Sequence, residues 1–159
     1  MAAGILAVFP ERREAAGLAG PSGAIIQPVA TILIVDDDAT VGLTFSRMLE
    51  LDGHTVLRAE SGAEGLARLA AGPPDAVILD MRMPLMSGLD FLRRVRSQAP
   101  LHDLPVGIVT GDYFMKEDVL EELTELGATV RYKPMWMDDL QTLTRTLLER
   151  PHADGAEAR

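Results

Sequence analysis

Acidic, hydroxyl and amino side chains directly follow four short apolar runs of the sequence. Asp36 and Asp37 follow the first of these runs, Asp80 ends the second, and Thr110 and Lys133 follow the last two. Carboxylates held close together repel one another unless a cation lies between them, and all-oxygen ligands suit Mg²⁺, which also binds phosphate oxygens. Such a site predicts phosphoryl transfer, with Asp80 as the nucleophile and with Thr110 and Lys133 binding the phosphoryl oxygens.

These side chains can meet only if the runs that precede them lie side by side. Five runs rich in aliphatic and β-branched residues alternate with amphipathic stretches, a pattern typical of buried parallel strands joined by helices. It predicts an α/β fold in which the carboxyl ends of the strands share one edge of the sheet. The predicted strands are residues 31–35, 55–58, 76–79, 106–109 and 129–132.

Five helices are predicted, one after each strand. Asp38 and Ser61 can cap the first two helices, because their side-chain oxygens accept from free backbone N–H groups. Gly53 and Gly127 end the first and the fourth helix. The last helix begins near Trp136. The side chain of Trp136 either docks a partner or packs in the interior, and we expect packing because tryptophan is usually buried.

Composition is that of one ordinary globular domain without cysteine. The 159 residues include 24 acidic and 15 basic side chains, giving a net charge of −9, which argues against direct binding to nucleic acid or to an anionic membrane. No apolar run reaches the roughly 18 residues of a membrane span, and the lack of cysteine excludes disulfides and zinc–thiolate sites. We expect residues 1–29 to be a flexible extension, or the product of a misassigned translation start, 30–150 to be the folded domain and 151–159 a disordered tail.

Four segments together resemble the receiver domain of bacterial response regulators. They are ILIVDDD at residues 32–38, AVILDMRMPLMSG at 76–88, VTG at 109–111 and YKP at 132–134. Each motif alone is a weak signal, but all four occur in the family's order and spacing, across residues 31–149. The resemblance implies a flavodoxin-like, doubly wound sheet of five parallel strands in the order 2-1-3-4-5, with five helices, as in chemotaxis receivers.

The resemblance implies a role for each residue of the acidic cluster. Asp80 resembles the aspartate that accepts a phosphoryl group. Asp36 and Asp37 resemble the acidic pair that holds Mg²⁺, with Asp37 as the direct ligand. Asp80 and the backbone carbonyl of Arg82 would complete the protein ligands of the metal.

The resemblance also implies how the domain signals. Thr110 resembles the switch hydroxyl, Lys133 resembles the lysine that binds the phosphoryl group, and Pro134 would follow a cis peptide bond. Such a cytoplasmic, stand-alone receiver catalyses only its own phosphorylation and dephosphorylation, and takes its phosphoryl group from a sensor histidine kinase or a histidine phosphotransfer protein. As a monomer or a phosphorylation-dependent homodimer, it would contact an unknown output protein through its fourth helix, fifth strand and fifth helix.

One departure from the family pattern concerns the aromatic residue that usually lies three residues before the lysine. Val130 stands there instead, and Tyr132 lies next to Lys133. The sequence therefore leaves open whether a coupled hydroxyl–aromatic switch operates in this chain.

Further unusual residues flank the site. The resemblance implies that Arg82 and Asp112 tune how water reaches the phosphoryl group, and the two could also pair across the mouth of the site. The alternative is two solvated charges of little energetic weight. Tyr113 and Phe114 follow directly, and we expect one of these aromatic side chains to lie on a surface that binds a partner.

Two other functions fit part of the sequence. A pseudo-receiver would fold in the same way and act by contact alone, without phosphorylation. A phosphatase of the haloacid dehalogenase type would also use an aspartate after a strand, but it needs a second acid two residues later, where this chain has Arg82.

Overall fold

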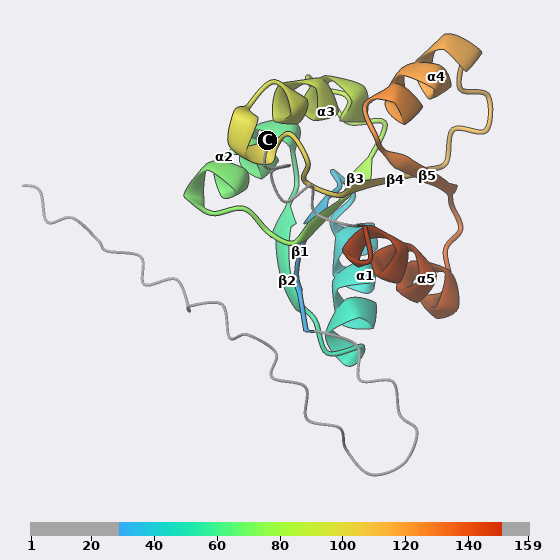
Figure 1. Cartoon of the computed structure of the whole chain (residues 1–159). Helices are drawn as coiled ribbons and strands as arrows, with labels where there is room; N and C mark the ends of the chain where they lie inside the picture. The colour runs from blue at the N-terminus through green and yellow to red at the C-terminus, as the bar shows by residue number, and fades with distance from the viewer. Residues whose placement is uncertain (1–28, 151–159) are drawn as a thin grey trace, which may run out of the picture.

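The chain forms a single parallel sheet in the order β2-β1-β3-β4-β5, as predicted (Figure 1). The computed structural model describes residues 29–150, so the extension and tail expected at 1–29 and 151–159 lie outside it, apart from Val29. The strands are β1 (Thr31–Val35), β2 (Thr55–Ala59), β3 (Ala76–Asp80), β4 (Val106–Thr110) and β5 (Thr129–Tyr132).

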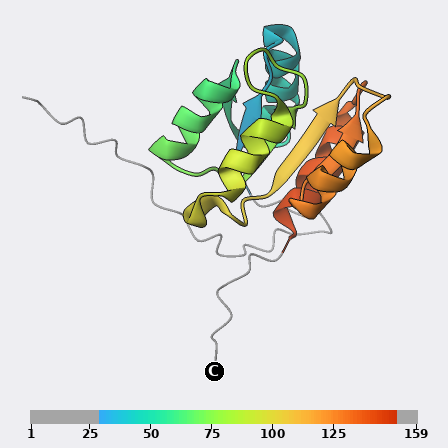
Figure 2. The ribbon, with the colours of Figure 1, turned by 90° about the horizontal axis from the view of Figure 1, so that it is seen from above.

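The helices cover both faces of the sheet, with α1 and α5 on one face and α2, α3 and α4 on the other (Figures 1 and 2). As the cap residues predict, the side chains of Asp38 and Ser61 accept from backbone N–H groups in the first turns of α1 and α2. A short 3₁₀ helix, η1 (Ala99–Leu101), lies between α3 and β4. The α-helices are α1 (Ala39–Leu51), α2 (Gly62–Ala71), α3 (Gly88–Arg96), α4 (Glu117–Glu125) and α5 (Met137–Leu148).

The core consists of two apolar layers separated by the sheet. Every residue of β3 and β4 is buried, and four of the five residues of β1 are buried, because these central strands have helices on both faces. The layer beneath α2, α3 and α4 centres on Phe91 and Leu92, and the layer beneath α1 and α5 centres on Leu49 and Leu140. This burial holds the strand ends in place.

The carboxyl ends of β1, β3, β4 and β5 lie next to one another at one edge of the sheet. The register pairs Val35 with Leu79, and Thr110 with Tyr132. Gly88 allows α3 to begin directly beside β3, since a Cβ atom at this position would lie only 2.6 Å from the carbonyl oxygen of Asp80. Among residues 29–150, no helix is both long enough and apolar enough to span a bilayer.

Candidate functional site

Three carboxylates meet at the carboxyl edge of the sheet. Asp36 and Asp37 follow β1, Asp80 ends β3, and each offers an oxygen within 4.8 Å of the other two. Asp36 and Asp80 are only 5% and 9% exposed, whereas Asp37 is open to solvent. Two buried carboxylates and one exposed carboxylate therefore form a strongly acidic cluster.

Lys133 lies between the two buried carboxylates. Its Nζ is 3.1 Å from Oδ2 of Asp36 and 3.5 Å from Oδ1 of Asp80. Burial acts to lower the pKa of Lys133, but the charges of Asp80 and Asp36 together outweigh it and raise that pKa above its usual value. The ammonium group is therefore held in its charged form.

The surroundings of Asp80 alter the pKa of its carboxyl group. Burial raises the pKa of Asp80 above its usual value and the charge of Asp36 adds to the increase, although the Lys133 ammonium opposes it. Three carboxylates face one ammonium group, so an additional cation would relieve the excess negative charge. Hard oxygen donors in this number suit Mg²⁺.

Thr110 supplies a hydroxyl at the end of β4, next to this cluster in the sheet. The residue is 1% exposed, and its Oγ1 accepts from the backbone N–H of Asp112 at 3.0 Å. Its backbone carbonyl accepts from the N–H of Lys133 at 2.8 Å, which joins the ends of β4 and β5. The peptide bond between Lys133 and Pro134 is cis, as the family resemblance implied.

Arg82 and Asp112 pair across the loops that follow β3 and β4. The Arg82 guanidinium donates to Oδ2 of Asp112 at 2.6 and 3.1 Å, so the pairing that the sequence left open is present. The Arg82 hydrogen bond lowers the pKa of Asp112. Among residues 29–150, no N–H or O–H group donates to the backbone carbonyl of Arg82, which leaves that oxygen available to a metal ion.

Several aromatic side chains lie exposed near the site. The ring of Tyr113 stacks on that of Tyr132, with centroids 5.5 Å apart and planes at 16°, and Phe114 is 94% exposed. The expectation that Trp136 packs inside is wrong, since it is 69% exposed. The preceding residue, Met135, occupies the core beneath α5, and Trp136 is turned outward in extended backbone before the helix begins.

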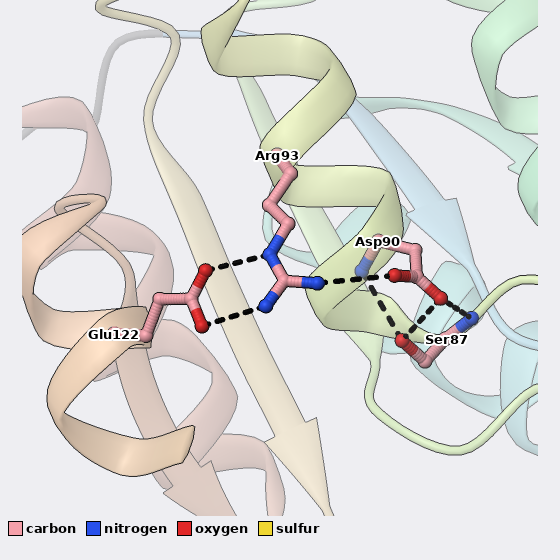
Figure 3. A network of polar contacts seen from close by, with 4 residues as sticks. All are labelled: Ser87, Asp90, Arg93 and Glu122. Carbon is pink, nitrogen blue, oxygen red and sulfur yellow. Dashed lines mark hydrogen bonds and ion pairs between the residues drawn. The ribbon is translucent and has the colours of Figure 1, made fainter. Parts of the chain in front are cut away.

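Helix α4, which lies beside this region, is tied to α3 by a bidentate ion pair between Arg93 and Glu122 (Figure 3). Arg93 of α3 donates to the two carboxylate oxygens of Glu122 at 2.6 and 2.7 Å. Asp90 accepts a longer bond from the same guanidinium and closes the cap of α3 with Ser87. Leu123 is the one fully buried residue that α4 contributes, so polar contacts also hold this helix.

Comparison with known proteins gives a consistent result. A family model described as the response regulator receiver domain matches residues 32–145. The response regulator MprA of Mycobacterium ulcerans (strain Agy99) is 35% identical over 130 residues, covering 80% of this chain and 53% of that protein. The MprA protein of Mycobacterium sp. (strain KMS) is 36% identical over 126 residues, covering 77% of this chain and 52% of that protein. The chain thus spans about half the length of the curated relatives it matches.

Two solved structures illustrate the similarity of the fold. The chemotaxis protein CheY4 of Vibrio cholerae has a TM-score of 0.70 at 29% identity, and the match covers 76% of this chain and 100% of that one. A response regulator receiver domain protein from Clostridium thermocellum has a TM-score of 0.68 at 34% identity, covering 77% of this chain and 96% of that one.

Proposed function

This chain belongs to the response regulator receiver family of two-component signalling, and on that basis we propose that Asp80 accepts a phosphoryl group from a phosphohistidine. The observation that carries the proposal is the position of Asp80, a largely buried carboxylate with the Lys133 ammonium 3.5 Å away. The alcohol of Thr110 ends the neighbouring strand. An acceptor carboxylate, a cation and a hydroxyl donor are the groups that phosphoryl transfer requires.

In the proposed reaction, an Oδ atom of ionised Asp80 attacks the phosphorus atom. The new O–P bond forms as the P–N bond to the donor imidazole breaks, and its electron pair returns to the ring nitrogen, which takes up a proton. Lys133 would then donate to a phosphoryl oxygen in place of Asp36 and Asp80, and the Thr110 hydroxyl would donate to another. Both groups stabilise negative charge as it develops on the transferred group.

The residues present fit a Mg²⁺ ion. Asp37 would be its direct ligand, supported by Asp36, Asp80 and the backbone carbonyl of Arg82, since these are hard oxygen donors around an excess of negative charge. Bound there, the ion would neutralise charge on the phosphoryl oxygens.

We assign the donor to a sensor histidine kinase or a histidine phosphotransfer protein in the cytoplasm, and the output to contact with another protein. The surface of α4, β5 and α5 would carry that contact, in a monomer or in a homodimer that phosphorylation induces. The exposed side of α4 is acidic, which disfavours nucleic acid and favours a basic protein partner. Its exposed carboxylates are Glu117, Asp118, Glu121 and Glu125.

Incubation with acetyl phosphate and Mg²⁺, followed by intact-mass spectrometry, tests the proposal. We expect the mass of one phosphoryl group to be added to the native chain, stable in acid and labile in base. The increase should be absent in Asp80→Ala and retained in Asp138→Ala, which removes an exposed carboxylate of α5. No increase in the native chain would instead support the pseudo-receiver, and rapid multiple-turnover hydrolysis of phosphate esters would support the phosphatase.

A further inference from the structure

Tyr113 contacts the end of β5 that carries Lys133. Its phenolic O–H donates to the backbone carbonyl of Lys133, and its ring stacks on that of Tyr132. Tyr132 is in turn the partner of Thr110 in the register of β4 and β5. Tyr113, three residues after Thr110, therefore contacts the backbone of Lys133, the other residue proposed to bind the phosphoryl group.

The loop that carries Tyr113 is fixed from the opposite side as well. The N–H of Asp112 donates to the Thr110 hydroxyl at 3.0 Å, and the Asp112 carboxylate is held by Arg82 and by the N–H of Phe114. Tyr113 thus projects from a loop whose backbone is bonded to the site hydroxyl. A displacement of that hydroxyl would move the loop, and with it the phenolic ring.

The backbone of Lys133 has two polar attachments in this arrangement. Its N–H donates to the carbonyl of Thr110, and its own carbonyl accepts from Tyr113. The aliphatic side chain of Val130, where the family usually has an aromatic residue, has no group that could make a hydrogen bond. The backbone position of Lys133 sets where its ammonium group lies relative to Asp80, since that group reaches the carboxylate from one fixed point.

From these contacts we propose that Tyr113 is a positioning residue for Lys133. It holds the backbone from which the ammonium group reaches Asp80, and it passes a movement of Lys133 to the exposed Tyr113–Tyr132 pair. The second part of the inference rests on the proposed function, because the movement arises when Lys133 turns to a phosphoryl group. The first part concerns the resting protein alone.

The chain offers a direct readout, since Lys116 and Lys133 are its two lysines. Labelling lysine with ¹³C at Cε gives two NMR signals, which Lys116→Arg assigns. We expect Tyr113→Phe, which removes the hydroxyl and keeps a ring to stack, to shift the Lys133 signal towards that of exposed Lys116. In Tyr132→Phe, which loses a hydroxyl without a hydrogen-bond partner among residues 29–150, the Lys133 signal should stay in place, so that loss of the Tyr113 contact is distinguished from a general loosening of the fold.

Calorimetric titration with beryllium fluoride in saturating Mg²⁺ tests the second part. Tyr113→Phe should weaken the affinity about fivefold, the factor that one net hydrogen bond is worth. The change in fluorescence of Trp136, the single tryptophan, on binding beryllium fluoride should be smaller in Tyr113→Phe than in the native protein. The matched control is Tyr132→Phe, which loses a hydroxyl from the other ring of the stack and should stay within about twofold of the native affinity.

The outcomes separate the two proposals. If Tyr113→Phe leaves the Lys133 signal and the affinity unchanged, or if Tyr132→Phe alters them equally, Tyr113 is not a positioning residue. If the native chain binds no beryllium fluoride, the proposed function fails, while the NMR comparison of the resting proteins still decides whether Tyr113 places Lys133.

Discussion

Replacement of Asp80 by asparagine should stabilise the metal-free fold at neutral pH. Asparagine keeps the shape of the side chain but removes a charge that is buried and lies close to Asp36. The attraction of Lys133 offsets only part of this cost, since the pKa of Asp80 is raised overall. Lys133 retains its contact with Asp36 at 3.1 Å in the variant, so no charge is left without a partner there.

The sign of the effect follows from linkage between protonation and folding. Because burial and the charge of Asp36 raise the pKa of Asp80 in the folded state, we expect Asp80→Asn to increase the free energy of unfolding by about 0.5–2 kcal/mol, the usual range for a stabilising substitution. Below the ordinary aspartate pKa of 3.8, Asp80 is protonated in both states and costs nothing. As pH rises from there through the raised folded pKa, the native protein loses this stability, and Asp80→Asn does not.

Urea denaturation followed by circular dichroism, in EDTA and across pH, measures the difference. The difference in the free energy of unfolding between Asp80→Asn and the native protein should increase as pH rises above about 4 and become constant near neutral pH. Mg²⁺ should reduce this difference in the free energy of unfolding, because an ion that binds the folded native site stabilises that state by mass action. The reasoning is refuted if Asp80→Asn is the less stable protein at neutral pH in EDTA.

Two further substitutions test what places the site. Arg96→Met should cost about 2 kcal/mol in urea denaturation, because the half-buried guanidinium donates to three backbone carbonyls after α3 and at the end of α4; Arg94→Met, at an exposed position, should cost little. Gly88→Ala should destabilise by about 1–3 kcal/mol and weaken Mg²⁺ binding measured by calorimetry, since its methyl group would displace the Asp80 backbone. Gly42→Ala has open space in α1 and should instead stabilise, and an equal loss in both alanine variants would contradict the packing argument.

Local sequence was sufficient to predict the elements and the edge of the sheet at which the site lies. The bounds of β1 and β5 agree with the prediction, and the other strands differ by one residue at an end. Continuous apolar runs can be buried only inside a sheet covered on both faces, which requires parallel strands and brings their carboxyl ends together. Asp36, Asp37 and Asp80 follow such runs, which predicts the edge of the sheet that they share, whereas the order that places β1 beside β3 was implied by the family resemblance.

Contacts between side chains from different loops depended on the tertiary structure. The pairing of Arg82 with Asp112 was one of two possibilities until the structure showed that their side chains form hydrogen bonds. Nothing in the sequence indicated that Tyr113 donates to the carbonyl of Lys133. Trp136 was expected in the interior because tryptophan is usually buried, yet its neighbour Met135 occupies that place. Periodicity defines which residues share a strand or helix, but the direction of a side chain in a loop depends on backbone turns and on partners distant in the chain, so only the folded arrangement could decide it.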